Sequence, residues 1–249
     1  FFSTSLISLL LLRNGNSMAT KLLYIEDFDI VSCEAKVLGV SKTEDERTDI
    51  ILDQTCFYPR GGGQDWDTGS ISSDNGNFSV EEVRLDHEGV VHHIGSFGDG
   101  EFGIGEPANC EVDIKTRETN TRLHSAGHLL DMAVQELASD WIPGRGAHYP
   151  HMSFVEYEVP SGTETDEALK ERLQQKVSEL TQSDYQNKLL FMSKDEMAKY
   201  CRHVPDNLPS NKPLRIVLYA DDFGIPCGGT HVKSTQEVGQ INITKVKIK

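Results

Sequence analysis

Hydrophobic and polar residues alternate over short stretches in the first half of the chain. Alternation with a period of two residues is typical of β-strands that have one buried face, and glycines between the stretches supply turns. The alternating stretches are residues 31–40, 49–58, 78–85, 90–94 and 110–114. Because short, regularly spaced strands often close on themselves to hide their edges, we predict a small β-barrel over residues 18–114.

Beyond residue 115 the hydrophobic period lengthens to that of an α-helix. Cap-forming side chains at 119–121, followed by leucine and valine at helical intervals, predict a helix of about five turns that ends near Ala138. A second amphipathic helix is predicted after Thr165 and a shorter one over 193–201, with strands at 152–159, 214–220 and 240–249. We therefore predict an α+β fold, in which the barrel domain precedes a two-layer α/β domain (115–249) with a mainly antiparallel sheet.

Composition narrows the class of protein. The chain has 249 residues, of which 37% are hydrophobic, so it can bury one large core or two modest ones. No stretch approaches the ~18 uninterrupted apolar residues of a membrane span, and five scattered cysteines do not make a disulfide framework. We expect a soluble, monomeric, cytoplasmic protein. Residues 1–17, which precede Met18, are interpreted as a leader or upstream-derived segment outside the fold.

The charge is unevenly distributed. The formal net charge is −15, but residues 1–114 carry 7 Lys and Arg against 21 Asp and Glu, whereas residues 115–249 carry 17 against 18. Acidity argues against a protein that coats nucleic acid, because phosphate binding requires Lys and Arg. Since nearly all of the excess lies in the first half, the second half can still contact a nucleic acid.

Four residues in two pairs have the spacing of metal ligands. His124 and His128 are four positions apart in the first predicted helix, so both imidazoles can point at one centre. Cys227 and His231 are also four apart, in a turn whose glycines let the backbone fold around an ion. Three imidazoles and one thiolate form a tetrahedral set suited to zinc. The histidine pair alone has a simpler explanation as two surface or core imidazoles.

Several other chemistries are excluded or disfavoured. A zinc peptidase of the HExxH type requires Glu where Ser125 stands, and the sequence GGGQ at 61–64 matches neither common nucleotide-binding pattern. The remaining histidine groups are interpreted as packing or surface residues: His92 with His93, His148 with His151, and Cys201 with His203. The other thiols, predicted to pack on strands as small apolar groups, are those of Cys33, Cys56 and Cys110.

Three segments together resemble a known family. RLHSAGHLL at 122–130, CGGTHV at 227–232 and FYPRGGGQ at 57–64 look like the editing domain of alanyl-tRNA synthetases, and the length is similar to that of AlaX-type trans-editing proteins. The resemblance implies a barrel domain followed by an editing domain of the kind shared with threonyl-tRNA synthetases. It also implies zinc at His124, His128, Cys227 and His231, and a glycine-rich loop beside the substrate cleft.

The sequence departs from this family at three places. Ser125 stands where the synthetases often have Thr, and Asp65-Trp66 follows Gln64 where free-standing members often have a proline. The chain also stops soon after CGGTHV, without the Gly-Arg-Arg segment that typically follows, so we expect a shortened carboxyl end. No ATP-binding segment is recognisable, and we do not expect the chain to charge tRNA.

The function predicted from this resemblance is deacylation of mischarged tRNA, with the seryl or glycyl ester on alanine tRNA as substrate. Gln64 and Ser125 are predicted as catalytic residues, and zinc either polarises the water or organises the pocket. The substrate-binding residues are predicted to be Gly61, Gly62, Gly63, Gly228, Gly229 and Thr230. The tRNA contacts are predicted to be Lys115, Arg117, Arg122, Arg145 and Lys233, together with the lysines of 245–249.

Two other classes of function remain open at this stage. One is a non-catalytic tRNA-binding or synthetase-associated module whose zinc is structural, which would bind metal without deacylating tRNA. The other is a metal-dependent hydrolase of a different ester, which would cleave small esters but not charged tRNA.

Overall fold

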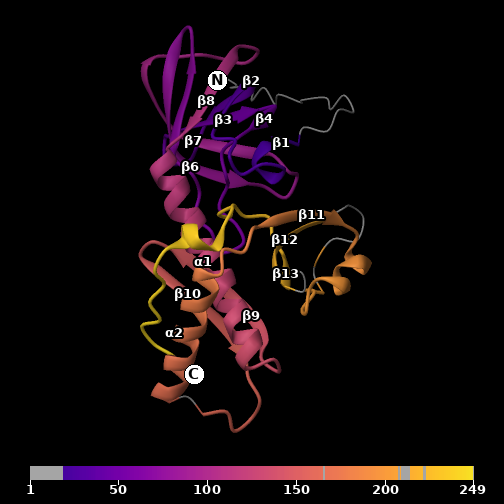
Figure 1. Ribbon diagram of the computed structural model, residues 1–249. Helices are drawn as coiled ribbons and strands as arrows, with labels where there is room; N and C mark the ends of the chain where they lie inside the picture. Colours follow the sequence, from indigo (N-terminus) through magenta and orange to yellow (C-terminus); the bar gives the residue numbers. More distant parts are fainter. Residues whose placement is uncertain (1–18, 165, 207, 209–213, 221–222, 249) are drawn as a thin grey trace, which may run out of the picture.

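The computed structural model describes residues 19–164, 166–206, 208, 214–220 and 223–248 (Figure 1). The segment interpreted as a leader, 1–17, lies outside these residues. The barrel is at one end of the molecule, and helix α1 (Ile114–Leu137) leads from it into the second half. No helix of the described part combines the length and the apolar character that crossing a membrane would require.

The predicted barrel is confirmed as a closed sheet of six strands in the order β2-β3-β7-β6-β5-β8. Every neighbouring pair is antiparallel. The strands are β2 (Ser32–Lys42), β3 (Thr48–Leu52), β5 (Gly69–Ser73), β6 (Gly76–Leu85), β7 (Val91–Gly100) and β8 (Pro107–Val112). β5 was not predicted, because its sequence GSISS has one apolar residue. The short strands β1 (Lys21–Leu22) and β4 (Gln54–Thr55) form a separate parallel pair. The 3-10 helix η1 (Leu23–Ile25) directly follows β1.

The barrel interior is filled by the apolar residues that alternate along its strands. Val37, Leu52, Ile71 and Phe78 are at most 1% exposed. The three thiols predicted as packing groups belong to this core: two are buried in it, and Cys33 packs against its edge. Burial of this kind stabilises the barrel by roughly 25 cal/mol for each Å² of apolar surface removed from water.

Helix α1 begins at Ile114, earlier than the predicted start at 119. The carboxylate of Asp113, which directly follows β8, accepts a hydrogen bond from the Thr116 backbone N–H at 3.0 Å and caps the helix. Thr119, predicted to lie at the cap, is inside the helix, where its hydroxyl donates to the Lys115 carbonyl. The earlier start was missed because the first turn is polar and carries no hydrophobic stripe.

The second half contains two antiparallel sheets and helix α2 (Glu167–Gln182). One sheet is the hairpin of β9 (Ile142–Tyr149) and β10 (Met152–Glu158); the other has the order β11-β12-β13. Its strands are β11 (Lys188–Met192), β12 (Leu214–Ala220) and β13 (Phe223–Pro226). The predicted third helix is the 3-10 helix η2 (Lys194–Lys199), and a further one is η3 (Thr235–Val238). The α+β class is confirmed, while the two-layer arrangement and the domain boundary at 114 stay predictions.

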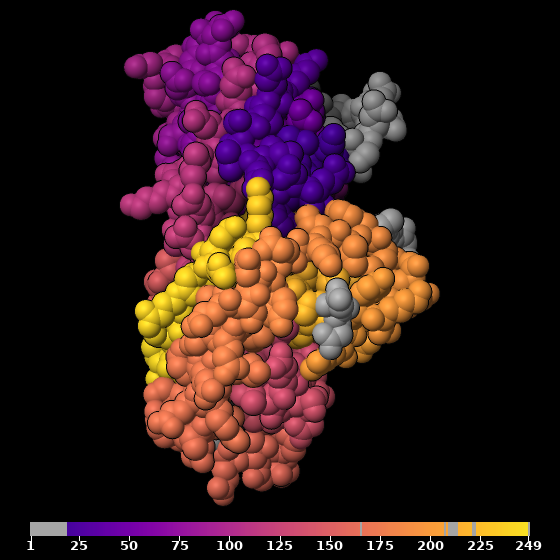
Figure 2. All heavy atoms as spheres, in the orientation of Figure 1, coloured from indigo at the N-terminus to yellow at the C-terminus, as the bar shows by residue number. Residues whose placement is uncertain are grey.

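The strand predicted at 240–249 is wrong over the residues that the structure describes. Residues 240–248 have no regular secondary structure, and they run along the surface of the second half as the yellow segment of Figures 1 and 2. The alternation is real, because Ile241 and Ile243 pack against the core beneath α2. The Gln174 carboxamide of α2 takes the place of a partner strand, donating to the Ile241 carbonyl at 2.7 Å and accepting from the Ile243 N–H at 2.8 Å.

A buried ion pair fastens α1 to the barrel. The Arg117 guanidinium, on a residue that is 4% exposed, donates to the Asp67 carboxylate at 2.6–3.1 Å and to the Cys56 carbonyl at 2.7 Å. Asp67 also accepts from the Tyr58 N–H, so both charges are hydrogen-bonded within the protein. The prediction that Arg117 contacts tRNA is not supported by this position, because its side chain is turned into the protein.

We predict that Asp67→Asn lowers the free energy of unfolding by about 3–5 kcal/mol, because it leaves the Arg117 charge buried without a counter-ion. Urea denaturation measures the change. The control is Glu118→Gln, which removes a partner from the exposed pair with Arg122 (3.9 Å) and should cost less than about 1 kcal/mol. Equal stability of Asp67→Asn and the wild type would show that the pair does not hold the two halves together.

Candidate metal centre

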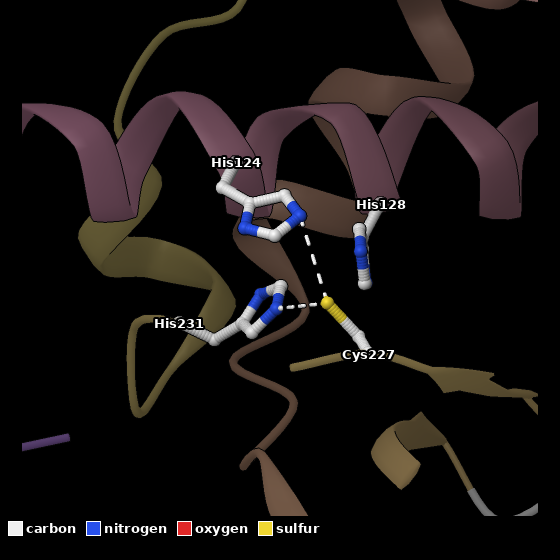
Figure 3. Close-up of side chains that lie close together, drawn as sticks. All are labelled: His124, His128, Cys227 and His231. Atoms are coloured by element: carbon white, nitrogen blue, oxygen red, sulfur yellow. Dashed lines mark hydrogen bonds between the residues drawn. The ribbon is translucent and has the colours of Figure 1, made fainter. Parts of the chain in front are cut away.

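The two predicted ligand pairs meet in one cluster. His124 and His128 project from one face of α1 toward Cys227 and His231, which lie on the segment after β13 (Figure 3). One ligand atom from each of the four residues lies within 4.8 Å of the other three. Cys227 Sγ is 3.6 Å from His124 Nε2 and 3.3 Å from His231 Nε2. This arrangement can hold a metal ion.

The proton positions on His124 follow from the hydrogen bonds of Gln64. The backbone N–H of Thr230 can only donate, and its partner is Gln64 Oε1 at 2.9 Å. The same oxygen lies 2.7 Å from His124 Nδ1, which must therefore be the protonated nitrogen of a neutral ring. His124 Nε2, which faces the cluster, is left with a free electron pair. A histidine that binds metal usually has its other nitrogen held in this way.

His231 is also held through its Nδ1, by different residues. Its Nδ1 lies 2.9 Å from the Tyr219 hydroxyl and 3.3 Å from Ser125 Oγ, so its Nε2 is turned toward Cys227. The Ser125 hydroxyl also accepts from the Val232 N–H at 3.1 Å. On His128, Nδ1 is buried and has no hydrogen-bond partner among the described residues. An unpartnered buried imidazole nitrogen beside three other donor atoms fits a ligand that binds there.

Burial keeps the three imidazoles neutral. Desolvation lowers the pKa of His128 to about 3 and the pKa values of His124 and His231 well below the usual 6.5. Neutral imidazole is the form that binds metals. Burial raises the pKa of the Cys227 thiol, and the nearby Arg215 guanidinium opposes that rise by favouring the thiolate.

Arg215, on β12, holds the loop that carries Cys227. Its guanidinium donates to the Cys227 carbonyl at 2.8 Å, to the Gly229 carbonyl, and to the Ile25 carbonyl at 3.0 Å. The face of the guanidinium lies 4.9 Å from the centre of the Phe28 ring. Because one planar group satisfies carbonyls on both sides of Gly228, the loop is fixed at its two flanks and the cluster geometry is set before any ion binds.

Glycine is required at two positions of the site because other groups come too close. A Cβ on Gly229 would overlap the His124 ring and lie 2.8 Å from Gln64 Oε1, whereas a Cβ on Gly228 would meet no atom within 4 Å. Gly63 has a φ of 78°, and a Cβ there would lie 2.6 Å from the Gly146 carbonyl. The glycine-rich loop thus packs against β9. The segment 227–231, called the metal-binding loop because it would supply two of the ligands, packs against His124.

The predicted site residues fall into an inner and an outer set. Gln64, Ser125, Gly229 and Thr230 are buried around the cluster, Gly63 is half-buried, and the exposed glycines are Gly61, Gly62 and Gly228. The predicted tRNA contacts other than Arg117 are exposed: Lys115, Arg122, Arg145 and Lys233. Three of these have acidic neighbours, Glu118 for Arg122, Glu156 for Arg145 and Asp29 for Lys233. The roles assigned to all these residues stay predictions.

Comparison with known proteins bears on the same segments. Residues 16–116 match the family model of tRNA synthetases class II (A), and residues 214–249 match that of the threonyl and alanyl tRNA synthetase second additional domain. The chain is 30% identical over 89% of its length to the alanyl-tRNA editing protein AlaX-L of Pyrococcus horikoshii. It is 28% and 30% identical over 92% of its length to the alanine–tRNA ligases of Methanobrevibacter smithii and Archaeoglobus fulgidus.

Over most of its length the chain is therefore similar to alanyl-tRNA synthetases and alanyl-tRNA editing proteins. It spans 53% of the length of the Pyrococcus horikoshii editing protein and about a quarter of the two ligases, 25% and 24%. The family resemblance drawn from CGGTHV and its partner motifs is confirmed, and the cluster is the meeting point of two of those motifs.

Sequence reasoning missed some of the residues that surround the cluster. Arg215 and Tyr219 lie four positions apart on β12, and both contact the metal-binding loop. The available signal was a charged residue in an otherwise apolar strand. His148 packs its ring on His124, with 5.0 Å between ring centres and 25° between planes. Burial lowers the pKa of His148 to about 4. Thr121 bonds to Thr230 Oγ1 at 2.6 Å. No sequence spacing identifies these last two contacts.

We predict that Gly229→Ala disrupts the centre and that Gly228→Ala does not. The added methyl group of the first variant displaces His124 or Gln64, which should lower metal affinity and cost about 1–3 kcal/mol of stability, a typical cost of overpacking. The methyl group of the second variant enters open space. Metal content after dialysis and the thermal midpoint compare the two variants. Equal behaviour of the pair would contradict the close contact at Gly229.

Proposed function

We propose that the chain is a zinc-dependent editing hydrolase that acts in trans on mischarged tRNA. The reaction is hydrolysis of the ester between a wrongly attached amino acid and the terminal adenosine, with seryl or glycyl esters on alanine tRNA as substrates. The observation that carries the proposal is the cluster of His124, His128, Cys227 and His231 in a chain that is similar to an alanyl-tRNA editing protein. Cys227 and His231 lie in the segment that matches the threonyl and alanyl tRNA synthetase second additional domain.

Zinc suits this donor set better than other common ions. One thiolate with three imidazoles is a tetrahedral combination typical of zinc, whereas calcium and magnesium prefer oxygen donors. When bound, zinc would supply Lewis acidity to water or to the ester carbonyl or, if all four side chains stay attached, a fixed framework for the pocket.

The residues around the cluster would position groups and hold protons. Gln64 keeps the proton of His124 on Nδ1, and Tyr219 with Ser125 holds Nδ1 of His231. Because Gln64 and Ser125 are fully buried and already hydrogen-bonded, we assign them to positioning the ligands. Gly228 is exposed beside the half-buried Cys227, so its backbone is the part of the loop that a substrate can reach.

The tRNA would be held by the less acidic half of the protein. Lys115, Arg122, Arg145 and Lys233 are exposed there, as are Lys245 and Lys247 near the end of the described chain. With a net charge of −15 for the whole chain, phosphate contacts should give weak, salt-sensitive binding that releases the product quickly. We further propose a monomer that works in the cytoplasm.

A second candidate function is supported by the completeness of the cluster. Four protein ligands are the usual number of a structural zinc site, which has no free coordination position for a substrate. On this reading the chain would be a tRNA-binding module associated with a synthetase and would have no hydrolytic activity of its own.

We predict that the purified protein contains about one zinc per chain. It should hydrolyse alanine tRNA that carries serine faster than alanine tRNA that carries alanine. Cys227→Ala should lower the hydrolysis rate at least about 100-fold, in the range seen when an essential catalytic interaction is removed. Cys33→Ala, which changes a half-buried thiol of the barrel, is the matched control and should keep full zinc and activity. Release of amino acid from labelled charged tRNA measures the rate.

Each alternative has its own outcome in the same experiment. Full zinc content with an intact seryl ester would support the structural-zinc module and end the editing proposal. Hydrolysis of small esters without hydrolysis of charged tRNA would point to a different substrate. Retention of full zinc by a His124→Ala, His231→Ala double variant would contradict the ligand assignment.

A further inference from the structure

Four planar side chains form a stack beside the glycine-rich loop. The Arg60 guanidinium carbon lies 5.4 Å from the centre of the Trp66 ring and 4.9 Å from that of the Tyr149 ring. Tyr149 in turn lies parallel to His151, with 12° between ring planes and 5.8 Å between centres. We call these four residues the Arg60 stack. Two come from the barrel half and two from the hairpin of β9 and β10, so the stack joins parts that are far apart in sequence.

The stack is fixed in position yet open to solvent. The Trp66 indole N–H donates to the Glu81 carbonyl at 2.8 Å, and the backbone N–H of Arg60 donates to the Val83 carbonyl at 3.1 Å. The Arg60 side chain nevertheless remains 51% exposed, and His151 is exposed. The nearest acidic group, Asp65, is 3.9 Å from Arg60, which is too far for a close hydrogen-bonded pair. The stack therefore offers a ligand a partly exposed guanidinium and an exposed imidazole at its end.

The stack is connected to the cluster through His148 and through the glycine-rich loop. Tyr149 follows His148, whose ring packs on His124 at 5.0 Å between centres. Arg60 precedes the glycine-rich loop, and the Gly63 carbonyl accepts a hydrogen bond from the His148 N–H at 2.8 Å. A chain of direct contacts thus runs from the stack to the metal ligands.

We propose that the Arg60 stack binds a nucleobase of the single-stranded 3′ end of tRNA. The inference rests on the proposed function for the identity of the nucleic acid, but the chemistry of the stack is independent of it. Bases of single-stranded nucleic acid stack on aromatic rings and on guanidinium planes, and this contact needs little phosphate neutralisation. Since the first half of the chain has a net charge of −14, stacking supplies affinity that electrostatics cannot.

The proposal is tested by binding of the full chain to two RNAs, measured by fluorescence anisotropy. One is uncharged alanine tRNA with an intact CCA end, and the other is the same tRNA lacking CCA. Arg60→Lys keeps the charge and removes the planar group, and Tyr149→Leu removes a ring. Both should weaken binding of the intact tRNA by roughly 5- to 100-fold and leave the truncated tRNA unaffected. Phe191→Leu, at a 50% exposed ring on β11, is the control and should change neither.

Equal affinities of wild type, Arg60→Lys and Tyr149→Leu for intact tRNA would overturn the proposal, as would an equal loss for both RNAs. If Arg60→Lys or Tyr149→Leu lowers the thermal midpoint, binding of the same two RNAs is compared with His151→Ala. This variant changes the exposed end of the stack and leaves Arg60 in place. A seryl-tRNA hydrolysis assay separates the two proposals. Binding as expected without hydrolysis by the wild type would end the editing proposal alone, whereas hydrolysis with an unchanged KM in the variants would end the stack proposal alone.

Discussion

The carboxamide of Gln64 is the interaction on which the arrangement of the centre depends. Its oxygen accepts from the Thr230 N–H and from His124 Nδ1, and its nitrogen donates to the Thr230 hydroxyl at 2.8 Å. These three bonds join the glycine-rich loop of the barrel, the first helix and the metal-binding loop. They also decide which nitrogen of His124 is free to bind an ion. One buried amide therefore fixes both the assembly of the chain and the chemistry of its site.

Burial determines the protonation of the imidazoles and of the thiol around that amide. Three imidazoles are kept neutral by desolvation, while burial raises the pKa of the Cys227 thiol and the buried Arg215 guanidinium opposes part of that rise. Burying an arginine is costly unless its donors are satisfied, and here backbone carbonyls of the metal-binding loop satisfy them. The guanidinium charge of Arg215 therefore lies beside Cys227, where a thiolate would reduce the free-energy cost of burying it.

The sequence predicted the barrel and the four clustered residues because both leave a local signal. Alternation over short stretches identified five barrel strands, whereas β5 has too few apolar residues to alternate. The spacing of His124 and His128 was readable from the sequence because both residues lie on one helix. The interactions that orient the ligands were not predictable, since Gln64 and Thr230 are 166 positions apart and meet only when the barrel docks on the helix. The strand predicted over 240–248 failed because one glutamine takes the place of a partner strand, and tertiary contacts likewise turn the Arg117 side chain inward.

We attribute the centre to zinc bound by one sulfur and three nitrogens from two distant motifs. X-ray absorption of the zinc-loaded full chain tests this most directly, because the fine structure reports the number and kind of atoms bound to the metal. We predict one sulfur and three imidazole nitrogens for the wild type and loss of the sulfur contribution in Cys227→Ala. A wild-type spectrum without sulfur, or one unchanged by that substitution, would contradict it.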